Sequence, residues 1–121
     1  MKKKINLYLD DLRDCPEDFV VARNMEQALY YLENDEYEVE ILSLDHDLGI
    51  DGEGKLLSSG YDLVKYFCEN GLRANSIYLH TDNPVGRDNM YYTLLAAKRR
   101  RFINSISVYP YPYVKNKYTE E

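Results

Sequence analysis

Strand-like and helical segments alternate along this chain, and that alternation restricts the fold more than any other feature of the sequence. Apolar residues at helical spacing predict helices over about 25–32, 60–68 and 87–101. Short apolar or period-two runs predict strands over about 5–9, 19–22, 39–44, 77–79 and 105–109. Because strands joined through helices form right-handed crossovers, we expect one parallel five-stranded sheet that is covered on both faces.

The first connection of this sheet differs from the others. Only residues 10–18 separate the first two predicted strands, and Pro16 interrupts them. That length leaves too little chain for a full helix, so we expect a loop or a single turn in place of the first crossover helix.

Acidic residues follow two of the predicted strands at once. The strand over 5–9 runs into Asp10-Asp11, and the strand over 39–44 runs into Asp45-His46-Asp47. The carboxyl ends of parallel strands lie at one edge of a sheet, where open α/β folds bind their ligands. We therefore expect these side chains to converge on one site, although solvated turns that cap backbone N–H groups would also use such residues.

Clustered carboxylates repel one another unless a cation lies among them. Oxygen ligands of this kind suit a divalent cation such as Mg²⁺, Mn²⁺ or Ca²⁺, with Asp10, Asp11 and Asp45 as the predicted ligands. The alternative is that each carboxylate is separately solvated or is paired with Arg13 or Arg87.

The sequence contains two histidines, and both fall at predicted strand ends on the same edge. His46 follows the strand over 39–44, and His80 follows the strand over 77–79. Histidine titrates near neutrality, so the pair suits a general base and a general acid, or one of them can join the metal shell. We expect both to lie on loops outside the core; the alternative is a purely structural histidine.

The segment after His80 has features of a phosphate site. A Pro/Gly turn over 83–86 leads into the last predicted helix, with Arg87 in its first turn. Arg87 can bind phosphate oxygens in a bidentate manner, with Asn83 beside it. Alternatively, Asn83 and Asp88 cap the helix while Arg87 pairs with an aspartate.

Composition narrows the class of protein. A chain of 121 residues fits a single domain over 1–121, with about 114–121 as a flexible tail. No long apolar run or signal-type segment is present, so we expect a cytoplasmic protein without membrane contact. A net charge of −6 argues against an extended nucleic-acid surface, although basic residues cluster over 98–101. The thirteen tyrosines either stack on bases or cover a small core.

Three motifs resemble those of a known family. They are Leu9-Asp10-Asp11-Leu12-Arg13, Leu44-Asp45-His46-Asp47-Leu48-Gly49 and the run from His80 to Met90. The acidic residues resemble the pocket of response-regulator receiver domains, and the three motifs in this order are similar to cyclic-phosphate processing receiver-like domains. The resemblance implies a flavodoxin-like three-layer sandwich of strand order 2-1-3-4-5. It also implies an enzyme that opens or removes cyclic phosphates, such as 2′,3′-cyclic phosphates at RNA ends or cyclic nucleotides.

The chain also departs from signalling receivers. Its last strand leads into Tyr109-Pro110-Tyr111-Pro112, without the lysine that a signalling receiver has directly at this strand end. No closing helix is predicted after it. Phosphorelay through Asp45 is therefore disfavoured.

These observations combine into one hypothesis, a metal-dependent phosphoesterase of receiver-like fold. Its substrate is a phosphate-containing small molecule or an RNA end, and a metal-bound water is the nucleophile unless Asp45 attacks covalently. The alternative is a non-catalytic or signalling receiver that binds a partner or nucleotide at the same edge. The assigned roles are cation binding by Asp10, Asp11 and Asp45, proton transfer by His46 and His80, support of the metal shell or of a histidine by Asp47, and phosphate binding by Arg13, Asn83 and Arg87.

Overall fold

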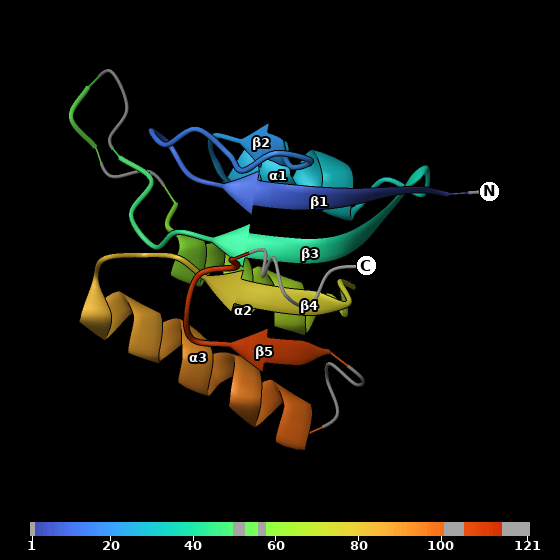
Figure 1. Cartoon of the computed structure of the whole chain (residues 1–121). Coiled ribbons are helices and arrows are strands. Elements are labelled where there is room, and N and C mark those ends of the chain that lie inside the picture. Colours follow the sequence, from blue (N-terminus) through green and yellow to red (C-terminus); the bar gives the residue numbers. More distant parts are fainter. Residues whose placement is uncertain (1, 50–52, 56–57, 101–105, 115–121) are drawn as a thin grey trace.

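The computed structural model describes residues 2–49, 53–55, 58–100 and 106–114 of the chain, and its centre is a parallel sheet (Figure 1). The strands pair in the order β2-β1-β3-β4-β5, which confirms the predicted 2-1-3-4-5 topology. The strands are β1 (Lys3–Leu9), β2 (Val20–Ala22), β3 (Tyr37–Leu44), β4 (Ser76–Leu79) and β5 (Ser107–Tyr109). The helices are α1 (Met25–Leu32), α2 (Gly60–Glu69) and α3 (Pro84–Arg99).

Each helix begins at a side chain that satisfies a free backbone N–H group. The Asn24 side chain accepts from the Gln27 N–H, and Ser59 and Asp62 form a reciprocal capping box at the start of α2. Asn83 Oδ1 accepts from the Gly86 N–H at 2.9 Å, so α3 begins at Pro84, three residues before the predicted start. Of the two helix caps suggested by the sequence, Asn83 is therefore the one used.

The hydrophobic core lies between the sheet and the helices. Each of the three crossovers through a helix moves in the same direction across the sheet, so right-handed connections place α1, α2 and α3 on one face. A hydrogen bond from the Tyr66 hydroxyl of α2 to Glu33 at the end of α1 fits this arrangement. The large fully buried side chains of this layer include Leu7, Leu9, Leu42, Leu44, Leu63, Val64, Phe67, Ile77, Leu79, Met90 and Leu94.

Aromatic side chains, not helices, cover the other face of the sheet in the described part of the chain. No helix occurs in 10–19, as predicted, or in 110–114. The segment after β5 turns back across β4 (Figure 1), and Tyr109, Tyr111 and Tyr113 all contact the Tyr78 ring. Tyr113 also packs on Phe19. For these tyrosines, cover of a small core is the better of the two interpretations.

Some predicted features lie outside the described residues. They are the last residue of the predicted third helix, the beginning of the last strand at 105, part of the loop over 49–59 and the tail over 115–121. Among the helices that are described, none is both long enough and apolar enough to cross a bilayer.

Candidate functional site

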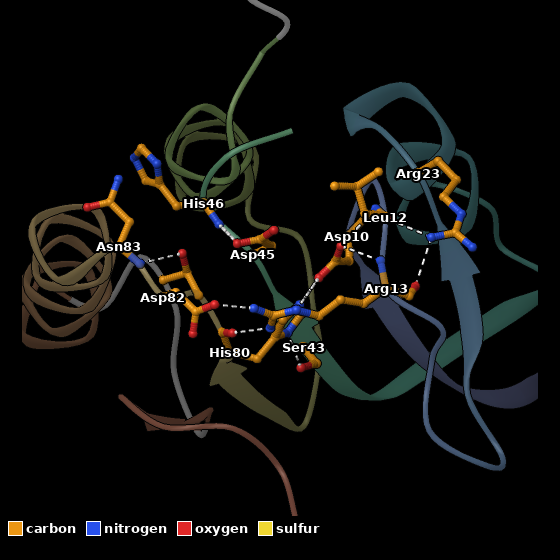
Figure 2. Close-up of polar contacts among 11 residues, drawn as sticks. Asp10, Leu12, Arg13, Arg23, Ser43, Asp45, His46, His80, Asp82 and Asn83 are labelled. Carbon is orange, nitrogen blue, oxygen red and sulfur yellow. Dashed lines mark hydrogen bonds and ion pairs between the residues drawn. The ribbon is translucent and has the colours of Figure 1, made fainter. Parts of the chain in front are cut away.

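The predicted site residues meet at the carboxyl edge of the sheet. Leu9, Leu44 and Leu79 end neighbouring strands in aligned register, so the residues that follow them are neighbours as well. Asp10, Asp45 and His80 each offer one ligand atom, and these atoms lie within 4.8 Å of one another (Figure 2). The predicted convergence of these three residues is confirmed.

Asp10 is the most constrained of these residues. It is 1% exposed, and its Oδ1 accepts hydrogen bonds from the backbone N–H groups of Leu12 and Arg13, both at 2.9 Å. Its Oδ2 lies 3.0 Å from His80 Nε2 and 3.8 Å from Arg13 Nε. Burial by itself raises the pKa of Asp10, but these hydrogen bonds outweigh it and hold the pKa below its usual value. Asp10 is therefore a carboxylate at neutral pH.

His80 is buried, contrary to the expectation that it lies on a loop outside the core. Its ring is stacked on Tyr8 with centroids 4.1 Å apart, and its Nδ1 lies 2.7 Å from Ser43 Oγ. Burial lowers the pKa of His80 to about 4, although Asp10 acts in the opposite direction. At neutral pH the ring is therefore neutral, and the pattern of partners assigns the proton to Nε2, which donates to Asp10, while Nδ1 accepts from Ser43.

Asp45 carries the least compensated charge of the cluster. Its Oδ1 accepts from the His46 N–H at 2.8 Å, and the Thr81 side chain also donates to it. Burial raises the pKa of Asp45 in spite of these bonds, and the nearby charge of Asp10 adds to the increase. A cation next to Asp45 would offset both effects.

His46 lies at the rim of the site and is held by a different set of residues. Its Nδ1 is 3.1 Å from Asp47 Oδ1, and the Asn83 side-chain amide donates to Asp47 Oδ2 at 3.3 Å. Because an ionised carboxylate only accepts hydrogen bonds, Asp47 favours the neutral tautomer with the proton on Nδ1 and a free lone pair on Nε2. The ring packs against Gly86, where an added Cβ would lie 2.4 Å from His46 Cγ. The His46 side chain is 18% exposed.

Arg13 and Arg87 are paired with acids, as one interpretation of the sequence allowed. Arg13 Nη1 donates to the His80 carbonyl at 2.9 Å, and its Nη2 is paired with Asp82. Arg87 Nε lies 3.7 Å from Asp88 on the same helix. Arg13 therefore reaches the site, whereas Arg87 is not among its described lining residues.

A cavity of about 330 Å³ lies at this edge, and carboxylates dominate its wall. Among its described lining residues Arg13 is the one cation. The acidic lining residues are Asp10, Asp11, Asp45, Asp47 and Asp82, of which Asp11 lies against Gly49. Such an oxygen-rich wall repels a phosphate but fits a hard divalent cation, to which a phosphate could then bind.

The donor set fits the predicted metal in part. Asp10 and Asp45 lie in the cluster, whereas Asp11 lines the cavity but is not among its close ligand atoms, and His80 stands in its place. Since His80 Nε2 already donates to Asp10, carboxylate oxygens remain the better ligands.

Sequence reasoning assigned no role to several residues that shape the site. Ser43, Tyr8 and Thr81 contact His80 or Asp45, and Asp82 pairs with Arg13. Ser43 and Tyr8 lie opposite each other on β3 and β1, each two residues before the acid of its own strand. Period two places them on the same face as those acids, which is the one signal that could have pointed to them.

The sheet order and the acidic strand ends define a receiver-like protein. A family model described as the cyclic-phosphate processing receiver domain matches residues 5–96. The chain belongs to this family, as its motifs indicated. Searches of curated proteins and of solved structures give no match.

Proposed function

We propose that this protein is a metal-dependent phosphoesterase that acts on a cyclic phosphate, either at a 2′,3′-cyclic RNA end or in a cyclic nucleotide. The observation that carries the proposal is the convergence of five carboxylates and one guanidinium around a cavity at the ligand-binding edge. Membership of a family linked to cyclic-phosphate processing supports the choice of substrate.

Carboxylate oxygens of Asp10, Asp11 and Asp45 would hold Mg²⁺ or Mn²⁺, which when bound polarises a phosphoryl oxygen and lowers the pKa of a bound water. Asp10 is held in place for this role by two backbone N–H groups and by His80. His80 would thus orient a metal ligand by donating to Asp10, without joining the metal shell itself.

His46 is the better placed histidine for proton transfer, because its Nε2 is a base and its ring is partly exposed. In the proposed reaction water adds to phosphorus, one ring P–O bond breaks, and the leaving oxygen gains a proton from the His46 imidazolium or from solvent. His46 Nε2 would accept the proton of the attacking water, and Asp47 would fix its tautomer and stabilise the imidazolium.

Phosphate binding is assigned to Arg13 and Asn83, which line the cavity. Arg13 is partly exposed and is paired with Asp82, whose side chain is 89% exposed, so this pair can separate at little cost when an anion binds. Arg87 does not line the cavity, so its part in phosphate binding is limited to the positive charge that it adds near the amino end of α3.

The test is turnover of a panel of 2′,3′-cyclic nucleotides to monoesters with Mg²⁺ or Mn²⁺. Asp45→Asn and His46→Ala should each lower kcat by roughly a hundredfold or more. Asp88→Asn, an exposed carboxylate on α3, is the matched control and should keep the parent rate. No turnover in any metal, together with labelling of Asp45 by acetyl phosphate, would replace this proposal by the signalling alternative.

A further inference from the structure

A second and larger cavity lies on the outer surface, between α2 and α3. It has a volume of about 570 Å³, within the range of about 300–1,000 Å³ that small-molecule sites occupy. Its wall includes Tyr61 and Lys65 of α2 and Asn89, Tyr92, Thr93 and Arg100 at or near α3. This groove is lined by none of the residues that line the acidic cavity.

The two helices that form the groove both begin against the Asp45–His46 segment of the acidic site. A Cβ at Gly60 would lie 1.9 Å from the Asp45 carbonyl oxygen, and a Cβ at Gly86 would overlap the His46 ring. The glycines therefore let both helices start directly on the Asp45–His46 segment. Figure 2 shows His46 directed toward the space between these two helices, away from Asp10. Tyr61 follows Gly60, and Asn89 lies one turn after Gly86, so the end of the groove at Tyr61 and Asn89 is the end nearer to His46.

The charge of the groove is opposite to that of the acidic site. Lys65 and Arg100 face a single acidic lining residue, Glu69, and Lys98 and Arg99 precede Arg100 at the end of α3. This basic end lies in a chain whose net charge is −6. An anionic ligand that avoids the carboxylate edge would therefore be attracted here.

Two tyrosines add a preference for planar groups. The Tyr92 side chain is 63% exposed, and the Lys65 ammonium lies 4.9 Å from the centre of the Tyr61 ring. Exposed aromatic rings beside cations are the elements with which proteins bind single-stranded nucleic acids without reading sequence. An acidic peptide would use the charges but not the ring faces.

We propose that the groove between α2 and α3 binds the nucleotides that precede the terminal phosphate of a single-stranded RNA, with that phosphate at the acidic site. This inference rests on the proposed function, because it takes the reacting phosphate to lie beside His46. Asn89 and Arg100 are about 16 Å apart along the helix axis, and stacked nucleotides repeat about every 3.4 Å. Arg100 is therefore reached only by a chain of several nucleotides.

The binding test uses a fluorescein-labelled ten-nucleotide RNA that ends in an unreactive 3′-phosphate, measured by fluorescence anisotropy with Mg²⁺ present. Tyr92→Ala and Arg100→Ala should each weaken binding at least about fivefold. The matched controls are Tyr30→Ala, an exposed tyrosine of α1, and Arg73→Ala, an exposed cation before β4 that does not line the groove. The controls should remain within about twofold of the parent. Equal losses in the variants and their controls would overturn the groove as the binding site.

The kinetic test compares a 2′,3′-cyclic mononucleotide with a ten-nucleotide RNA that ends in a 2′,3′-cyclic phosphate. Arg100→Ala should raise KM for the RNA with kcat unchanged and leave both constants for the mononucleotide unchanged. Turnover of both substrates without this difference would overturn the groove and keep the proposed function. RNA binding that depends on Arg100 without any turnover would keep the groove and overturn the proposed function. Displacement of the RNA by an acidic peptide of equal charge at equal concentration would overturn the nucleotide as the occupant.

Discussion

His80 Nε2 lies 3.0 Å from Asp10 Oδ2, although strand β3 separates the strands that precede these two residues. The imidazole crosses β3 over Ser43, whose side chain is small enough to leave room for the ring and whose hydroxyl meets Nδ1 at 2.7 Å. Tyr8 packs on the ring face. Asp10, which follows β1, is thus held in place by His80, which follows β4. The buried imidazole joins the two strand ends across β3.

Stability should therefore depend on pH through His80. Its folded pKa is about 4, and a histidine in the unfolded chain has its ordinary pKa of 6.5. The unfolded state binds the proton first, so this contribution is complete above pH 6.5 and is lost as the pH falls toward 4. The expected loss is about 3 kcal/mol of unfolding free energy, measured by urea unfolding at a series of pH values.

Two variants separate His80 from other titrating groups. His80→Asn should flatten the dependence between pH 6.5 and 4, and His46→Ala should retain it. Asp10, whose pKa is lowered, contributes only below its ordinary range and so outside this window. An unchanged slope in His80→Asn would show that the buried imidazole does not cause it.

Ser43→Ala should lower the unfolding free energy by about 1–2 kcal/mol, because His80 Nδ1 would remain buried without a donor. Ser43→Val should cost more, since a branched side chain occupies the space that the ring crosses. Ser107→Ala, an exposed serine on β5, is the control and should change stability by less than about 0.5 kcal/mol. Equal stability of the alanine variant and the parent protein would mean that the Ser43 hydroxyl does not support the ring.

The sequence predicted the fold well for two reasons. Apolar residues repeat at different periods in strands and in helices, and the helices begin at strong capping residues. The parallel sheet, the missing first crossover helix and the meeting of Asp10, Asp45 and His80 follow from alternation and from strand ends, whereas the strand order was implied by the family resemblance. Asn83 shows the limit of this reasoning, because a sequence pattern does not reveal that one side chain has two partners. The Asn83 side chain caps α3 and also donates to Asp47.

The burial of His80 could not be predicted from the sequence. A residue after a short strand is normally exposed, and its burial depends on Tyr8 and Ser43 from two other strands. The pairing of Arg13 with Asp82 could not be predicted for the same reason, because the whole sheet sets the distance between these two residues. Arg87 was placed at the phosphate by its position in the first turn of the helix, but the register of α3 pairs it with Asp88.

Metal binding should raise the melting temperature, and this increase should depend on the Asp45 carboxylate. A cation at one hundred times its dissociation constant stabilises the folded state by about 2.7 kcal/mol. Asp45→Asn should abolish that increase, whereas Asp88→Asn should keep it. In the presence of a chelator Asp45→Asn should melt at or above the parent temperature, because burial raises the pKa of Asp45 and its charge opposes folding. A parent melting curve that does not respond to saturating Mg²⁺ or Mn²⁺ would count against the site.

Gly86 should report directly on the position of the His46 ring. Alanine in a helix is normally about 1 kcal/mol more favourable than glycine. In Gly86→Ala, however, the new Cβ would lie 2.4–2.9 Å from ring atoms of His46, so we expect a loss of stability and a displaced ring with reduced turnover. In the His46→Ala background the clash is absent, and Gly86→Ala should become stabilising. The double-mutant cycle, measured by urea unfolding, should therefore give a coupling of about 1–3 kcal/mol. Additive changes would show that the ring lies away from α3. The proton-transfer role assigned to His46 would then be wrong.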